Sequence, residues 1–167
     1  LPEDRKTQAL FLPQSIRFNI SLPYLSALAS RVGTVQLGRE HAFVSREMTQ
    51  LTIRAHGPEM LISSLSGGNQ QKVALSKLTS GKPIVYLLDE PTRGIDVGTR
   101  REIYSLLRGV ARDGAGVIIV SSDTMELVGL CDRVIVMYEH RVVAEFEGTQ
   151  VSEANLVHAS VVGGSGV

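Results

Sequence analysis

The chain has 167 residues, of which 43% are hydrophobic and 20% are charged, a composition typical of a globular domain with a buried core. Its 17 basic and 17 acidic side chains cancel, which argues against a nucleic-acid partner or binding to an anionic membrane surface. The longest apolar runs fall short of the roughly 20 residues that span a bilayer, so the chain is not expected to cross a membrane itself. A single cysteine, Cys131, excludes an internal disulfide, and its apolar surroundings predict a buried thiol in a reducing cytoplasm.

The first third of the sequence is mainly helical by its apolar spacing. Helices are predicted over residues 15–22, 41–55 and about 66–80. In the second of these, Val44, Met48, Leu51 and Ala55 recur at helical offsets, and the pair Gly57-Pro58 is expected to stop the pattern.

From residue 84 onward, strands and helices alternate. The expected elements are strands at 84–88 and 116–121, helices at 97–112 and 123–130, a hairpin of 134–138 with 142–146, and a last helix at 151–161. The first strand is apolar throughout, which is typical of a strand covered on both faces. Asp96 can cap the helix at 97–112, whose apolar residues form one stripe. The alternation predicts parallel pairing and an α/β fold.

Two adjacent carboxylates, Asp89 and Glu90, follow the first strand. Ligands bind at the carboxyl ends of strands in open α/β sheets, so this position favours a functional role. One carboxylate suits a hydrated Mg²⁺ on nucleotide phosphates, and the other can deprotonate or orient an attacking water. Taken alone, an acidic pair at a strand end is more often a simple polar turn.

The segment LSGGNQQK places Ser66, Gly67 and Gly68 at the start of a predicted helix. A hydroxyl and backbone N–H groups at a helix N-terminus favour an anion such as a terminal phosphate. A lone Ser-Gly-Gly would more often be a turn or a helix cap.

Three motifs together resemble ATP-binding cassette proteins: LSGGNQQK the signature motif, LLDEP the Walker B strand, and the Gly94-Ile95-Asp96 segment the D-loop. LPEDRK, SIRFNI and DEPTRGIDVGT are also similar to the second cassette of duplicated ATPase subunits of bacterial ribose- and galactose-type importers. The resemblance implies a partial RecA-like P-loop NTPase fold. Its parallel sheet would have helices on both faces, joined to a helical signature subdomain, with the Walker A half absent.

The resemblance also implies a division of the chain. Residues 1–80 would form the helical signature subdomain, with a loop that replaces the Q-loop. Residues 81–150 would hold the Walker B strand, the D-loop and the switch strand of the core, and residues 151–167 a C-terminal helix and a flexible tail.

The family's site residues carry over to specific positions. Ser66, Gly67, Gly68 and Gln70 would contact the ATP held by a partner cassette, which is normally the first cassette of the same polypeptide. At this half's own site, Asp89 would hold Mg²⁺ through water and Glu90 would be the general base. Asp96 would belong to the D-loop.

Two positions depart from the general cassette pattern. Glu3 stands where most cassettes have the Q-loop glutamine, and Ser122 stands where they have the switch histidine. A serine cannot replace an imidazole as a charged partner of the transition state, so weak hydrolysis is expected at this half's own site.

The phosphate loop G-x-x-x-x-G-K-[ST] occurs nowhere in the printed sequence. We therefore expect no tight ATP binding by the isolated chain, which would be inactive alone. The strands and helix that normally carry this loop would be missing from the sheet, so apolar surface and self-association of the fragment are expected.

The function implied by the resemblance is that of a fragment of the ATP-hydrolysing, energy-coupling subunit of a carbohydrate importer. Its partners would be the other cassette, the membrane permease and, indirectly, a periplasmic sugar-binding protein. It would be cytoplasmic and peripheral on the inner face of the membrane. Residues 11–55 would dock the permease, although packing within the domain would give the same periodicity. A truncated, non-catalytic cassette that acts as an interaction module is the alternative, and a ribosomal or DNA-repair cassette is disfavoured by the neutral charge.

Overall fold

The computed structural model describes residues 1–163. They belong to two compact units, and the division falls between Ile118 and Ile119. The flexible tail predicted at the end of the chain lies mostly outside the described residues. Within the described part, no helix is long and apolar enough to cross a bilayer.

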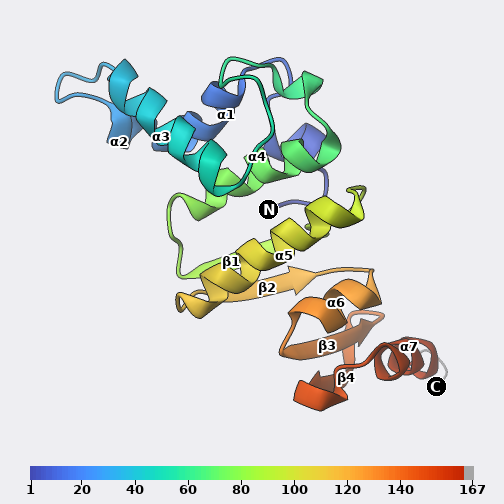
Figure 1. Cartoon of the computed structure of the whole chain (residues 1–167). Helices are drawn as coiled ribbons and strands as arrows, with labels where there is room; N and C mark the ends of the chain where they lie inside the picture. Colours follow the sequence, from blue (N-terminus) through green and yellow to red (C-terminus); the bar gives the residue numbers. More distant parts are fainter. Residues whose placement is uncertain (164–167) are drawn as a thin grey trace. The chain divides into compact units, whose positions relative to one another are not determined.

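The first unit begins with a layer of helices followed by two strands and a long helix (Figure 1). Its helices are α1 (Ile16–Ser21), α2 (Leu25–Leu28), α3 (Leu37–Gln50), α4 (Gly67–Thr79) and α5 (Val97–Arg112). A π-helical turn, Arg5–Ala9, precedes them. The predicted helices near residues 15–22, 66–80 and 97–112 are thus confirmed, the last with both of its bounds.

Apolar faces of α1, α3 and α4 form the core of the helical layer. Ile16, Ile20 and Val44 are fully buried there, which accounts for the apolar spacing seen in the first third of the sequence. The buried cluster comprises Leu10, Ile16, Ile20, Val44, Leu51, Ile53, Ile62, Leu65, Val73 and Ala74. Ser15 caps α1 by accepting a hydrogen bond of 3.1 Å from the Phe18 N–H.

Helix α3 does not have the bounds that its sequence predicts. The expected range was 41–55, but the helix begins at Leu37 and ends at Gln50. Thr52 takes a left-handed conformation with φ of 50° and turns the chain before Gly57 is reached. The Ile53 N–H donates to the Met48 carbonyl at 2.8 Å and the Thr52 N–H to the Thr49 carbonyl at 3.1 Å, the pattern of a Schellman motif.

Lys72 of α4 stabilises the turn at the end of α3. Its Nζ donates to the Thr52 carbonyl oxygen at 2.9 Å and pairs with Glu102 of α5. The side chain is only 4% exposed, so the ammonium depends on these partners. One buried cation therefore joins the end of α3 to α4 and α5.

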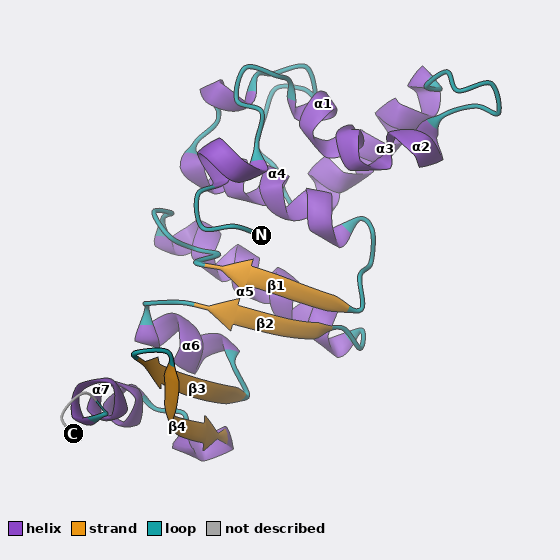
Figure 2. Cartoon of the chain, turned by 180° about the vertical axis from the view of Figure 1, so that it is seen from behind, coloured by secondary structure: helices purple, strands orange, loops and turns teal. Residues whose placement is uncertain are grey.

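Strands β1 (Val85–Asp89) and β2 (Gly116–Val120) pair in a sheet. The two arrows run in the same direction, and α5 lies on one face of the pair (Figure 2). The predicted parallel pairing across a helical crossover is confirmed. Side chains of β1 alternate between buried and exposed, because consecutive residues point to opposite faces.

Only one face of β1 is covered in this chain. Tyr86 and Leu88 are buried, as are Ile103 and Leu107 of α5. On the other face Leu87 is 63% exposed, and Ile118 of β2 is 56% exposed. The apolar run predicts a strand that is covered on both faces. In the structure one face is covered, and the other is apolar and open to solvent.

The second unit contains a hairpin and two helices. The hairpin pairs β3 (Arg133–Tyr138) with β4 (Arg141–Glu147) in antiparallel register, and the helices are α6 (Thr124–Leu130) and α7 (Glu153–Val162). All four elements were predicted at these places, with bounds within two residues. Asp123 caps α6 by accepting from the N–H groups of Met125 and Glu126 at 3.0 and 3.2 Å.

Cys131 follows α6 and is half-buried. Burial, followed by the charges of Glu126 and Asp132, raises the pKa of its thiol above the usual value. A raised pKa leaves less thiolate at neutral pH, so the half-buried thiol is expected to react slowly.

We expect Cys131 to react at least about tenfold more slowly with a disulfide reagent at pH 8 in the folded chain than in urea, because the thiolate is the reacting species. Absorbance of the released thiol measures both rates. Equal rates in buffer and in urea would contradict the protected environment.

Candidate functional site

The N-terminus of α4 is formed by Ser66 and the two glycines that follow it. Ser66 is exposed and caps the helix: its hydroxyl accepts from the main-chain N–H of Asn69 at 3.5 Å and from the Asn69 side-chain Nδ2 at 3.0 Å. The first N–H groups of a helix have no carbonyl partner within it, and the dipole of this 13-residue helix favours negative charge there. The arrangement suits an anion.

The two glycines have close neighbours, and those of Gly68 leave no room for a side chain. A Cβ added at Gly68 would lie 2.7 Å from both Cγ2 and Oγ1 of Thr99, so α4 and α5 could not approach as they do. A Cβ at Gly67 would lie 2.9 Å from Nη2 of Arg5 and 3.5 Å from the Gly94 carbonyl oxygen. Gly67 thus lies beside the D-loop segment and Arg5, whereas Gly68 is required for the packing of the two helices.

Asp89 and Glu90 occupy the end of β1, as the sequence predicts. Asp89 is exposed, and its main-chain N–H donates to the Leu1 carbonyl at 2.9 Å, which aligns the first residues of the chain with the strand end. Glu90 has φ of 46°, in the left-handed region that side chains other than glycine rarely occupy. Such strain is frequent at functional sites and stays in place only where the surroundings hold it.

We expect the free energy of unfolding of Glu90→Gly to exceed that of Glu90→Ala by about 0.5–1 kcal/mol. Both variants lose the carboxylate, but only glycine relieves the strain of the left-handed backbone. Urea unfolding of the two variants measures the difference. A more stable alanine variant would show that the backbone at this position is not strained.

Residues 91–94, which we call the strand-end turn, are held by side chains from other segments. Arg93 forms an ion pair with Glu3, the residue at the predicted Q-loop position. Its carbonyl oxygen accepts a hydrogen bond of 3.1 Å from Nη1 of Arg5. The loop that begins the chain is therefore in direct contact with the turn that follows the two carboxylates.

Asp96 begins α5 and uses its carboxylate as the cap. It accepts from the Thr99 N–H at 2.9 Å and from the Thr99 hydroxyl at 2.8 Å. These bonds, the backbone one first, lower the pKa of Asp96 below its usual value. The cap is thus complete above the ordinary carboxyl pKa and is lost as the pH falls through the lowered one. Asp96 therefore has a structural role as the cap of α5, in addition to its predicted place in the D-loop.

Gln70 is placed differently from the other signature residues. Its side chain is buried, and Nε2 donates to the carbonyls of Ile62 and Leu65 at 3.1 and 3.2 Å. These bonds fix the chain that leads into α4. The predicted contact of Gln70 with a nucleotide stays a prediction, whereas Ser66 and Gly67 lie at the exposed end of the helix.

Ser122 lies in the second unit, at the end of β2, and is exposed. Its neighbour Ser121 donates a 2.5 Å hydrogen bond to Oε2 of buried Glu126 and accepts one of 3.1 Å from the Asp123 N–H. The loop that carries Ser122 is therefore fixed by its neighbour and by the first turn of α6.

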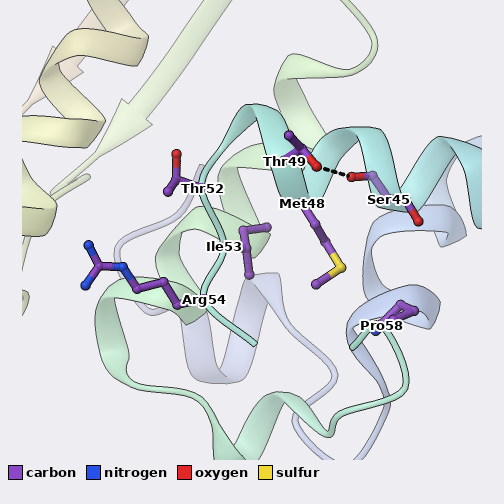
Figure 3. Close-up of a pocket in the computed structure, with 7 residues that line it drawn as sticks. All are labelled: Ser45, Met48, Thr49, Thr52, Ile53, Arg54 and Pro58. Atoms are coloured by element: carbon purple, nitrogen blue, oxygen red, sulfur yellow. Dashed lines mark hydrogen bonds between the residues drawn. The ribbon is translucent and has the colours of Figure 1, made fainter. Parts of the chain in front are cut away.

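A surface depression of about 450 Å³ lies at the end of α3 (Figure 3). Its lining residues are Ser45, Met48, Thr49, Thr52, Ile53, Arg54 and Pro58. The main-chain N–H of Arg54 donates to Oδ1 of Asn69 at 2.9 Å, so this wall of the depression adjoins the start of α4. None of the predicted site residues lines it.

Three residues near the site were not identified from the sequence: Arg5, Asn69 and Thr99. Asn69 could have been found, because it follows Gly68 within the motif and lies three residues after the cap. Thr99 has the same spacing from Asp96. Arg5 carries no local signal, since only the folded chain brings it to Gly67.

A family model described as ABC transporter matches residues 6–93, just over half of the chain. Among relatives, the ribose import ATP-binding protein of Ruegeria sp. is 46% identical over 158 residues, which are 95% of this chain and 31% of that protein. The corresponding protein of Rhizobium etli is 45% identical over 165 residues, 98% of this chain and 32% of its own length. The chain thus spans about a third of the length of these relatives.

Solved structures share the fold. An ATP-binding cassette in the ADP conformation matches with a TM-score of 0.70 and 18% identity, over 89% of this chain and 63% of that one. A dimeric cassette with ADP and phosphate, in a post-hydrolysis state, matches with a TM-score of 0.69 and 23% identity, over 84% and 60%. At these identities the likeness shows the fold, which is that of a partial P-loop NTPase with a parallel sheet.

Proposed function

Because this chain belongs to the ABC transporter family, we propose that it acts as part of the ATP-hydrolysing subunit of a bacterial carbohydrate importer. The relatives matched over nearly the whole chain are named ribose import ATP-binding proteins, which supports a sugar as the transported solute. In this proposal the chain contributes its signature motif to ATP held by a partner cassette.

The observation that carries the proposal is the exposed start of α4 beside the D-loop. Ser66 caps a helix whose first N–H groups are free of helical partners, and a Cβ at Gly67 would lie 3.5 Å from the Gly94 carbonyl. These groups form one wall of an anion site. In the proposal, Ser66 and the N–H groups of Gly67 and Gly68 donate to the terminal phosphate of the partner's ATP.

The strand end would serve a second nucleotide site, the chain's own. Asp89 would hold a water of Mg²⁺, and Glu90 would accept a proton from the attacking water. Ser122, in the position of the switch histidine, supplies no positive charge, so we propose that turnover at this site is slow.

The residues present suit Mg²⁺ and ATP. Asp89 offers an exposed carboxylate oxygen at the strand end, which suits an ion whose other ligands are water and phosphate. When bound, Mg²⁺ neutralises phosphate charge. The chain's own contributions are the exposed carboxylate of Asp89 and the donors at the start of α4.

The proposed partners are a second cassette, the membrane permease and, through the permease, a periplasmic sugar-binding protein. Residues 11–55 would dock the permease at the cytoplasmic face of the membrane. The exposed apolar face of β1 and β2 also supports self-association of the isolated chain, because Leu87 and Ile118 lie more than half exposed there.

We expect the full-length protein, assembled with its permease and binding protein in vesicles, to hydrolyse Mg-ATP faster when the sugar is present. The isolated 167-residue chain should show no micromolar affinity for Mg-ATP by calorimetry, because its sequence lacks the lysine and backbone cradle of the phosphate loop. Hydrolysis that is absent from the assembled full-length protein would reject the importer function. Micromolar binding of Mg-ATP by the isolated chain would show that ATP binding does not depend on a phosphate loop.

A non-catalytic interaction module, which keeps the docking surface without turnover, is the second candidate. The encoding gene distinguishes the two. A continuous upstream frame with that motif and a neighbouring permease gene supports the importer subunit, and a stop codon directly upstream supports the module.

A further inference from the structure

Gln71 joins α4 to the strand-end turn. Its Nε2 donates a hydrogen bond of 2.6 Å to the carbonyl oxygen of Pro91, the residue directly after Glu90. The side chain is 3% exposed, and Pro91 is buried too. Since water does not compete for this bond, it fixes the main chain of the turn to the helix.

The amide of Gln71 is only half satisfied. Its Oε1 is buried and has no hydrogen-bond partner among the described residues. An unpaired buried carbonyl opposes folding, and an apolar side chain of similar size would avoid that penalty. What the apolar side chain would lack is the bond to Pro91, so this bond is the property that distinguishes glutamine here.

Other side chains hold the far end of the same turn. Arg5 donates to the Arg93 carbonyl at 3.1 Å, and Glu3 pairs with the Arg93 side chain. The main chain of the turn is thus fixed at Pro91 by α4 and at Arg93 by the first residues of the chain. Of these contacts, only that of Gln71 comes from the helix that Ser66 caps.

We infer that Gln71 is a positioning residue, which fixes the strand-end turn to α4 so that phosphate binding at Ser66 changes the position of Gly94 and of the D-loop that begins there. The inference rests on the proposed function, in which the start of α4 and the end of β1 face different nucleotides. Gln71 touches neither nucleotide, because it is buried between the two elements. It makes the helix and the turn move as one body.

The test replaces Gln71 with leucine in the full-length protein assembled with its permease. The expected result is at least about a fivefold fall in kcat for Mg-ATP, with KM changed by less than about twofold. The melting temperature should stay close to that of the wild type, because the variant removes the unpaired Oε1 but leaves the Pro91 carbonyl without a donor. Ser80→Ala is the matched control. It removes a 2.7 Å hydrogen bond to the Ser76 carbonyl at the other end of α4 and should leave kcat unchanged.

Hydrogen exchange of residues 92–95 gives a second readout in the same proteins. Gln71→Leu should speed exchange in this segment by about tenfold, and Ser80→Ala should not. An unchanged kcat in Gln71→Leu, or a fall that follows a loss of melting temperature, would overturn the positioning role. A wild-type protein without ATPase would instead reject the proposed function, and the exchange rates would still report whether Gln71 holds the turn.

Discussion

Ser66→Arg in the full-length, assembled protein is expected to lower sugar-stimulated ATPase by at least about 100-fold. Ser66 is exposed at the start of α4, where the proposed role is to receive the terminal phosphate of the partner's ATP. An arginine would fill this space. It would also add a second guanidinium beside Arg5, which lies within contact distance of Gly67. Phosphate release in vesicles measures the effect.

Two further variants separate the possible causes. Ser66→Ala removes the cap, which is worth about 1 kcal/mol of stability, but leaves space for a phosphate, so its ATPase should fall less. Glu90→Gln should change the rate little if, as proposed, Ser122 takes the place of the switch histidine and turnover at the chain's own site is slow. Equal losses in Ser66→Arg and Glu90→Gln would contradict the assignment of the two motifs to different sites.

Gly68→Ala is expected to lower the free energy of unfolding by about 1–3 kcal/mol, because the new methyl group must displace Thr99 or separate α4 from α5. Its Cβ would lie 2.7 Å from two side-chain atoms of Thr99 and 3.0 Å from a third. Thr99→Ala removes the first two atoms, so the double variant should recover part of the loss. Urea unfolding of the single and double variants measures this coupling.

Gly109→Ala is the matched control, since it makes the same change within α5. A Cβ at Gly109 has no heavy atom within 4 Å, so only helix propensity changes and stability should rise by about 1 kcal/mol. The same substitution is thus expected to lower the free energy of unfolding at position 68 and to raise it at position 109. A stabilised Gly68→Ala would show that the helices separate without strain.

Helix α5 was predicted with both bounds correct because every signal agrees: an N-cap at Asp96, one apolar stripe, and Gly114 after the end, where φ is 95°. For α3 the signals mislead. Its first turn carries Leu37, which is 72% exposed, so no apolar periodicity marks the start. Its end depends on Thr52 in a conformation that a β-branched residue rarely takes, and local preference cannot predict it.

The candidate site likewise contains residues that the sequence predicts and residues that it does not. Ser66, Asp89, Glu90 and Asp96 lie within continuous motifs, and the structure places each at a helix start or a strand end as those motifs predict. Arg5 and Gln71 act through contacts with residues 88 and 20 positions away, respectively. Contacts over such separations depend on how α4 packs against the strand-end turn, so neither spacing nor composition reveals them.

The burial of Lys72 restricts what amine-directed labelling can report about this protein. The sequence has four lysines, Lys6, Lys72, Lys77 and Lys82. Lys72 is held by Thr52 and Glu102, and the Nζ of half-buried Lys77 donates to the Ala9 carbonyl at 2.5 Å. Acylating reagents and cross-linkers therefore reach Lys6 and Lys82 first, and residues 119–167 contain no lysine. Distance maps of the second unit will need carboxyl-directed chemistry.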